Sequence, residues 1–299
     1  LWKQEIKFML QEILEQLFEF AAKTIPDKQI LAAKKIYQME TGTIYEDDKS
    51  YDSRMALFLE WYLFNNYAPK SSKTVLQVLL ENNSEKINSD KLKIYKSISE
   101  SIQSLFLIQK VHDGSLKTIN LFTGEIYLVQ EKNSRLIFRK NDIFQGRIIY
   151  FQNQFHFTGN FCFHPERIHK YIKPEINLIA KKLKQYKKDL AKTEKILLKA
   201  KTKLNHYELN IKKLNKKLQN NNSENTIVKI NQKLNLLAED KGTQIKTIQE
   251  LVNQVSFIKN DRIKIEGNKQ ISALINHLAY KKLKWERSRQ IDISEIYKN

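Results

Sequence analysis

The chain has 299 residues, of which 41% are hydrophobic and 28% charged, and its formal net charge is +19 at pH 7. This length suits about two domains, and no apolar run approaches the roughly 18 to 20 residues that cross a bilayer, which excludes a polytopic membrane protein. A single cysteine, Cys162, excludes an intrachain disulfide and agrees with a reducing, cytoplasmic location.

The positive charge is concentrated in one part of the chain. Residues 1–100 carry 14 Lys and Arg against 15 Asp and Glu, whereas residues 175–219 carry 14 lysines against four acids. A bias towards A and T codons would raise the lysine content, but it would raise glutamate as well. The scarcity of acids in this segment is therefore a local property.

Residues 1–103 have the apolar spacing of helices, and the first stripe consists of Trp2, Ile6, Met9, Leu10, Ile13, Leu14, Leu17 and Phe18. Glutamates recur through this stripe, which a secretory signal segment would not tolerate, so we expect a cytoplasmic protein. The chain begins with Leu1 rather than Met, which leaves the completeness of the N-terminus open. The further helices expected here are Pro26 to about Met39 with a stop at Thr41-Gly42, residues 55–67 capped by Asp52 or Ser53, Ser72 to Leu80, and Ser89 or Asp90 to about Ser104.

From residue 104 to 164 the apolar period changes from 3.6 to 2, and short turns such as Asp113-Gly114 and Thr123-Gly124 separate the extended runs. One of these runs is expected to contain Leu136 and Phe138. Five or six short antiparallel strands in about 60 residues predict a small β-barrel or strongly curled sheet, too small to enclose a sizeable ligand.

After Pro174, which is expected to begin a helix, apolar residues recur with 3, 4 spacing, as at the a and d positions of a coiled coil. The first seam is Ile176, Ile179, Leu183, Tyr186, Leu190, Thr193, Leu197, Ala200, Leu204, Tyr207, Ile211, Leu214 and Leu218. A polar loop over 219–222 and a capping Ser223 precede the second seam, which is Ile227, Ile230, Leu234, Leu237, Lys241, Gln244, Ile248, Leu251, Val255, Ile258, Arg262 and Ile265. Two arms of matching length predict an antiparallel hairpin, each arm roughly 65 Å long at 1.5 Å per residue.

The expected fold is thus α+β and mainly α. A last helix over 269–290, with Ile271, Leu274, Ile275 and Leu278 as its apolar stripe, is expected to pack back on the rest. The expected domains are a helical domain over 1–103, a small antiparallel β-barrel over 104–164, a connecting helix over 165–174, a basic coiled-coil hairpin over 175–267 and the returning C-terminal helix over 268–299.

The lysines of the first arm fall outside its seam. A long helix needs a solvated exterior, but such a surface usually intersperses glutamates that pair with lysines four residues away. Because acids are scarce here, the arm is expected to bind a polyanion, and lysine rather than arginine favours phosphate contact without base reading. The candidate nucleic-acid contacts on the arm are Lys181, Lys184, Lys187, Lys188, Lys192, Lys195, Lys199, Lys203, Lys212, Lys213, Lys216 and Lys217.

The strand region offers a second basic surface, with Arg135, Arg139 and Arg147 as candidate contacts. Its aromatic residues, Phe138, Phe144, Tyr150, Phe151, Phe155 and Phe157, have two readings. They form either a platform on which bases stack beside cations, or simply the core of a small barrel.

Motifs for chemistry are scarce. His156, Cys162, His164 and His169 lie close together in sequence, but their spacing matches no common zinc module, and a polar strand face followed by a helix cap accounts for them. The acidic loop around Asp47 and Asp48 could hold a divalent cation or cap the next helix. The seven glycines never cluster, so phosphate-binding and dinucleotide fingerprints are absent from the sequence, and no cofactor or catalytic residue is predicted.

The segments EWYLFNNY (60–67), LFTGEIYLVQE (121–131) and FHFTGNFCFHP (155–165) resemble the N-terminal region of uncharacterised bacterial proteins, some of which end in a cysteine-rich metal-binding motif like that at the tail of the SecA motor protein. The resemblance implies a bacterial origin. The cysteine-rich tail is not in this sequence, so the resemblance brings no metal or partner with it.

These patterns predict a non-catalytic binding factor that contacts RNA or DNA phosphates through its basic arm, while the helical domain docks on a protein partner. The alternative is a protein-interaction scaffold whose coiled coil pairs with another coiled coil or with itself, and the oligomeric state is open.

Overall fold

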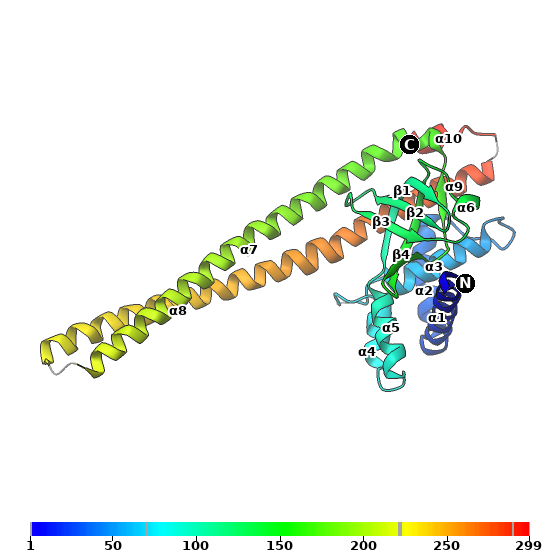
Figure 1. The fold of residues 1–299 in the computed structure, drawn as a ribbon. Helices are drawn as coiled ribbons and strands as arrows, with labels where there is room; N and C mark the ends of the chain where they lie inside the picture. Colours follow the sequence, from blue (N-terminus) through cyan, green and yellow to red (C-terminus); the bar gives the residue numbers. More distant parts are fainter. Residues whose placement is uncertain (1, 70, 221–222, 289, 299) are drawn as a thin grey trace. The chain divides into compact units, whose positions relative to one another are not determined.

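The computed structural model describes residues 2–69, 71–220, 223–288 and 290–298, and the side chains of residues 2–8, including Trp2 and Ile6 of the first apolar stripe, lie outside the described part. Over these residues the chain is mainly helical, with a mixed sheet of six strands and a long helical hairpin (Figure 1), which confirms the fold class at this level. The chain divides into two compact units. The first unit is Leu1–Leu183 with Gly267–Asn299, and the second unit is Lys184–Glu266. None of the described helices has the length and apolarity needed to span a bilayer.

The helices that precede the sheet begin close to where the sequence predicts them. Thr74 and Gln77 form a capping box, so the N-cap of the fourth helix lies two residues after the predicted Ser72. The third starts at Tyr51 and has Ser50 at its N-cap, two residues before the nearer predicted cap, Asp52. The bounds are α1 (Trp2–Thr24), α2 (Asp27–Thr41), α3 (Tyr51–Phe64), α4 (Val75–Asn82) and α5 (Ser89–Ser99).

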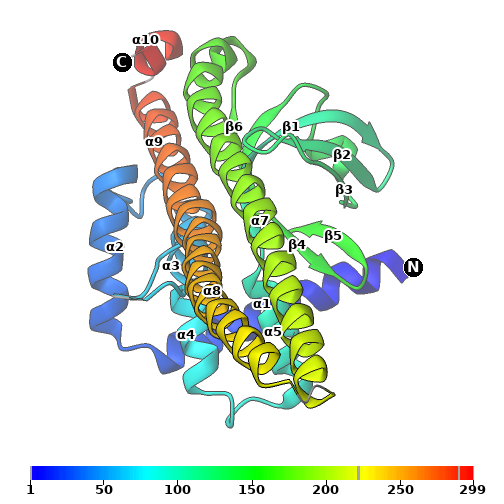
Figure 2. The same cartoon turned by 90° about the vertical axis from the view of Figure 1, so that its left-hand side faces the viewer.

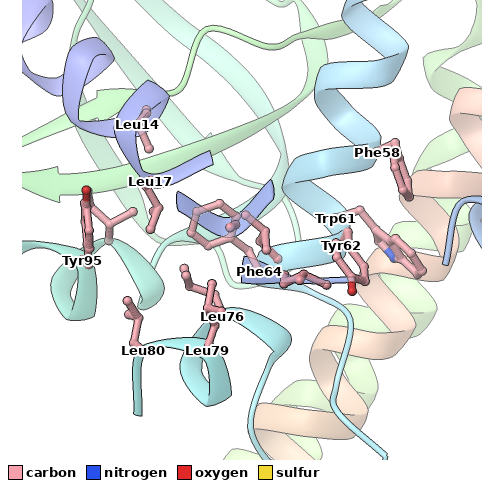
Figure 3. Packing of buried hydrophobic residues seen from close by; sticks show 14 of the residues in the cluster. Leu14, Leu17, Phe58, Trp61, Tyr62, Phe64, Leu76, Leu79, Leu80 and Tyr95 are labelled. Atoms are coloured by element: carbon pink, nitrogen blue, oxygen red, sulfur yellow. The ribbon is translucent and has the colours of Figure 1, made fainter. Parts of the chain in front are cut away.

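Apolar faces of these helices meet in one core, which contains Leu14 and Leu17 of α1, Phe58 and Trp61 of α3, and Leu76 of α4 (Figure 3). The same cluster includes two residues of the sheet, Ile149 and Phe151. The core of the helices therefore continues into the strand region.

The sheet contains β1 (Ile102–His112), β2 (Ser115–Asn120), β3 (Ile126–Gln130), β4 (Ile143–Phe151), β5 (Gln154–Phe157) and β6 (Cys162–His164). Helix α5 ends before the predicted Ser104, because residues from Ile102 onward pair with β4. The strands are ordered β1-β2-β3-β5-β4-β6, and β1 also pairs with β4, so a circuit of pairings closes through β1, β2, β3, β5 and β4.

The prediction that all the strands pair antiparallel is wrong for one pair, because β3 and β5 are parallel. The chain passes through β4 between them and so returns to β3 in the same direction. The strand expected around Leu136 is also wrong, because Ser134–Ile137 form a short helix, α6. The Ser134 hydroxyl donates to the carbonyl of His112 at 2.7 Å and is buried, whereas Leu136 is 87% exposed.

A 3₁₀ turn, η1 (Glu166–Ile168), leads into α7 (His169–Gln219), which is followed by α8 (Glu224–Phe257). Pro174 does not begin a helix as predicted but lies inside α7, five residues after its start. There its ring nitrogen cannot donate to the carbonyl four residues earlier, a loss that the rest of this long helix tolerates. Residues 221 and 222 of the predicted loop lie outside the described residues.

In the second unit α7 and α8 run side by side in opposite directions (Figures 1 and 2). Every predicted a and d position from Leu183 to Leu218 is buried or half-buried. Gln244 donates from Nε2 to the carbonyl of Ala200 at 3.0 Å, and Lys241 pairs with Glu208 at 3.1 Å. The predicted antiparallel hairpin is confirmed, and both polar seam residues have partners across it.

The last predicted positions of the second seam lie in a segment that is not α-helical, although Ile258 and Ile265 there are half-buried. Residues Ile258–Glu266 form a π-helical segment, η2, whose wider turns rotate successive side chains away from the heptad pattern. Arg262 is exposed, but its guanidinium still contacts the opposite seam, lying 5.6 Å from the ring centre of Tyr186, and it lies 5.5 Å from that of Phe257. The Tyr186 hydroxyl donates to Glu266 at 2.9 Å.

The chain ends in α9 (Gly267–Ser288) and α10 (Ile293–Lys298). The predicted apolar stripe of α9 is buried. Against α2, Asn276 donates to Glu40 at 2.7 Å, and Gly42 lies so close to Tyr280 that a Cβ there would be 2.8 Å from the ring. Helix α9 is thus part of the core of the first unit.

Candidate nucleic-acid interface

The twelve candidate lysines of α7 are all exposed. Their exposure follows from the heptad pattern, since the a and d positions face α8 and leave the other positions to solvent. The exposed residues are Lys181, Lys184, Lys187, Lys188, Lys192, Lys195, Lys199, Lys203, Lys212, Lys213, Lys216 and Lys217.

Five of these lysines form a continuous stripe in the second unit, at Lys184, Lys188, Lys192, Lys195 and Lys199. Their spacing of three or four residues keeps them on one face of α7, turned away from the seam. The stripe is about 22 Å long at 1.5 Å per residue. We call it the lysine stripe.

The four acids of this segment do little to neutralise the stripe. Glu208 pairs with Lys241 of α8 at 3.1 Å, and Glu175 lies 3.9 Å from Lys281. Asp189 accepts a hydrogen bond from Gln185 at 2.9 Å. Among the described residues, no carboxylate oxygen lies within 4.0 Å, the limit for a salt bridge, of the Nζ of any lysine in the lysine stripe.

Lys212, Lys213, Lys216 and Lys217 occupy the last two turns of α7. Carbonyl groups at the C-terminus of a helix lack intrahelical donors and carry partial negative charge. Lys216 and Lys217, which lie in the last turn, are therefore placed to stabilise the helix itself, in addition to any contact they make with a ligand.

The three candidate arginines of the sheet are in different environments. Arg135 and Arg139 are exposed, in and just after α6. Arg147 is only 1% exposed, so it is not available to a phosphate and is withdrawn from the surface candidates.

Arg147 instead joins β4 to α3. Its Nε donates to Glu60 at 3.2 Å, its Nη1 to Ser101 at 3.0 Å and its Nη2 to Asn65, and the guanidinium lies 4.6 Å from the ring centre of Phe64. Glu60 also accepts from Asn160 at 2.7 Å. Burial lowers the pKa of the Arg147 guanidinium, and the carboxylate of Glu60 opposes that shift.

A signal for this pair is present in the sequence. Glu60 is the one acid within MALFLEWYLFNNY, the most hydrophobic helical segment, and a buried carboxylate needs a buried cation nearby. The signal identifies Glu60 but not Arg147, because nothing local in the sequence links positions so far apart.

The aromatic residues of the strand region form the core rather than a stacking platform. Phe138, Phe144, Phe151 and Phe157 are each at most 8% exposed, and Phe144 packs against both Phe106 and Phe157. Phe155 is half-buried, and Tyr150 is 50% exposed. The interior of the sheet is thus filled by rings.

Two of the histidines around β6, His164 and His169, have hydrogen-bond partners within the chain. His164 Nδ1 lies 3.1 Å from the Tyr297 hydroxyl, and His169 Nε2 lies 3.1 Å from the carbonyl of His164. Burial raises the pKa of the Cys162 thiol to about 11, so the sulfur stays protonated near neutral pH. In the part of the chain that the structure describes, no group of three or more His, Cys, Asp or Glu could hold a metal ion.

The acidic loop is tied to α9. Asp48 accepts from both Nε and Nη2 of Arg287, at 3.0 and 2.6 Å, and from the backbone N–H of Tyr45 at 3.0 Å. The pKa of the Asp48 carboxyl is lowered, mainly by its hydrogen bonds from Arg287. This carboxylate therefore holds the loop against α9.

Residues 3–197 match the model of a protein family described as a family of unknown function (DUF7986). The match covers more than half of the chain and includes the lysine stripe except for Lys199. No curated protein and no solved structure matches the chain.

Proposed function

The chain belongs to DUF7986, a family of unknown function, and we propose that it is a non-catalytic binding factor whose α7 lysines contact the phosphates of RNA or DNA. The observation that carries the proposal is the lysine stripe, exposed along one face of α7, with no carboxylate of the described residues within 4.0 Å of its ammonium groups. Uncompensated like charges repel one another, and a polyanion relieves that repulsion.

The length of the stripe fits such a ligand. At 3.4 Å per phosphate along one strand, about 22 Å corresponds to roughly six phosphates. Lysine ammonium groups are compact and flexible, which suits contacts with a backbone and gives no means of reading bases.

The first unit has a different role in this proposal. We take the closed circuit of strands to be a small barrel, and its interior is filled by Phe106, Phe138, Phe144 and Phe157. Such a barrel provides a rigid base rather than a ligand cavity. A cytoplasmic location and a protein partner for the helices stay predictions from the sequence.

The test is a mobility-shift titration of the full chain with mixed-sequence duplex DNA and duplex RNA at several salt concentrations. Each phosphate neutralised contributes about 0.9 to the slope of log affinity against log salt. Replacing all five stripe lysines by Gln is expected to reduce the slope by up to about 4.5 and to weaken binding to every sequence alike.

A matched control removes the same net charge elsewhere, by replacing with Gln the exposed Lys28, Lys35, Lys86, Lys96 and Lys117 of the first unit. Its slope should stay close to that of the natural chain. Equal losses in the two variants, or binding that does not respond to salt, would reject the lysine stripe as the binding surface. Binding of DNA but not RNA, or the reverse, identifies the natural class of ligand.

A further inference from the structure

Helix α8 carries a second stripe with coiled-coil spacing, separate from its seam. The stripe follows 3, 4 spacing for four heptads and contains no charged residue. It consists of Val228, Asn231, Asn235, Ala238, Gly242, Ile245, Gln249, Val252 and Ser256, all exposed, and we call it the uncharged stripe. Val228, Ile245 and Val252 are 52%, 48% and 39% exposed.

The charges of α8 lie on its other faces. Between Val228 and Ser256 they are Lys229, Lys233, Glu239, Asp240, Lys241, Lys246 and Glu250. Long two-helix coils usually carry charges at the positions that flank the seam, since these positions are solvated. A flanking face about 42 Å long that lacks charges and has heptad spacing is typical of a surface that packs against another helix.

The neighbouring face of α7 carries alternating charges. Lys187, Glu194, Lys201 and Glu208 follow one another at intervals of seven residues, so they lie in one line along the helix. Glu208 contacts Lys241 at 3.1 Å, and the neighbours of Lys241 one turn to either side are Ala238 and Ile245. The line of alternating charges and the uncharged stripe therefore share one side of the hairpin.

The order of these charges is complementary to itself. When the line is laid antiparallel on a copy of itself about a two-fold axis midway between Glu194 and Lys201, each acid lies opposite a lysine. The contacts between the two helices, of Gln244 with Ala200 and of Lys241 with Glu208, show which part of α8 lies beside this midpoint. It is the stretch of about two helical turns between Ile245 and Val252. The same axis thus brings Ile245 of one copy opposite Val252 of the other.

We infer that the hairpin binds a second copy of itself through this side, forming an antiparallel four-helix arrangement. The apolar pair at the centre supplies burial, and the Glu194 and Lys201 pairs fix the antiparallel register. The interface lies outside the seam, and most of the lysine stripe, at Lys188, Lys192, Lys195 and Lys199, points to other faces of α7. The inference therefore stands independently of nucleic-acid binding.

The test is the mass of the full chain in solution, measured by sedimentation and light scattering without nucleic acid. The natural chain should be a dimer whose dissociation depends on concentration. Ile245→Glu with Val252→Glu should give monomers with unchanged helical content, whereas Leu236→Glu, at a 64% exposed position on another face of α8, should stay dimeric. A monomeric natural chain, or a dimer that survives the double substitution, would overturn the inference.

A charge exchange tests the register and does not disturb folding. Glu194→Lys alone and Lys201→Glu alone should each weaken the dimer, because each places like charges opposite one another. The two substitutions together should restore it, since the exchanged charges are again complementary. Failure of the combined variant to recover would show that a different arrangement holds the copies together.

Discussion

Arg147 Nε lies 3.2 Å from Glu60 Oε2, although the two residues are 87 positions apart and their side chains are only 1% and 3% exposed. Removing one partner leaves the other charge buried and unpaired, which typically costs about 3–5 kcal/mol. We expect Glu60→Ala to lower the free energy of unfolding by about this amount, as measured by urea denaturation.

An exposed ion pair provides the comparison. Asp90 and Lys93 are 3.2 Å apart, with side chains 82% and 79% exposed, and Asp90→Ala should change the free energy of unfolding by less than about 1 kcal/mol. Replacing both buried partners, as in Glu60→Leu with Arg147→Met, should be milder than Glu60→Ala. Equal losses for the buried and the exposed pair would contradict this account.

The stability of the first unit should decrease in mild acid because of His164. Burial lowers the pKa of His164 to about 3 from 6.5, and Lys282 and His169 act in the same direction. Below about pH 6.5 the unfolded chain takes up a proton that the folded chain does not, so the free energy of unfolding falls by about 1.4 kcal/mol per pH unit from this group.

The measurement is urea denaturation between pH 7 and pH 5, within the range where only the unfolded state binds this proton. His164→Gln, which keeps a polar group near the Tyr297 hydroxyl, should reduce the loss of stability across that range. His206→Gln, at an exposed position of α7, serves as the control. An unchanged pH dependence in His164→Gln would show that this histidine is not responsible.

Gly42 is expected to tolerate no side chain. Its φ is 81°, and an added Cβ would lie 2.8 Å from Tyr280 and 3.1 Å from Leu283. Gly42→Ala combines a backbone cost of about 1–2 kcal/mol with this overlap. At Gly114 φ is 73° and the space around an added Cβ is open, so Gly114→Ala should lower the melting temperature less; the reverse order would refute the role given to Tyr280.

The seam can be separated from the exterior of the hairpin with two leucines of α7. Leu204 is half-buried in the seam, whereas Leu209 is 55% exposed. Leu204→Asp should destabilise the hairpin by about 2 kcal/mol or more, because it removes apolar contact and desolvates a carboxylate. Leu209→Asp should leave thermal unfolding, followed by far-ultraviolet circular dichroism, nearly unchanged. Similar melting curves for the two variants would contradict the seam.

Much of the helical architecture could be predicted because its signals are local and repeated. Sustained 3, 4 spacing predicts the seam from Leu183 to Leu218, and the same pattern makes the lysines of α7 exposed. The end of α2 at Gly42 follows from glycine chemistry. Even the uncharged stripe of α8 can be found in the sequence once charges are mapped onto a helix surface, although apolar spacing alone does not reveal it.

The features that could not be predicted depend on distant parts of the chain. The parallel pairing of β3 with β5 is fixed by the path through β4, which no local period encodes. The burial of Arg147 depends on Glu60, on another element. The π-helical turns of η2, which hold the exposed Arg262, are not signalled either, because the heptad pattern continues through them in the sequence.

The contact between Lys241 and Glu208 limits how the two arms of the hairpin can move. If α8 slid along α7 by one heptad, Lys241 would move away from Glu208 and face either Lys201 or Asn215. The attraction between Lys241 and Glu208 would then be replaced by repulsion between two lysines, or by no charge interaction. The ion pair therefore favours the observed alignment of α7 and α8 over either shifted one.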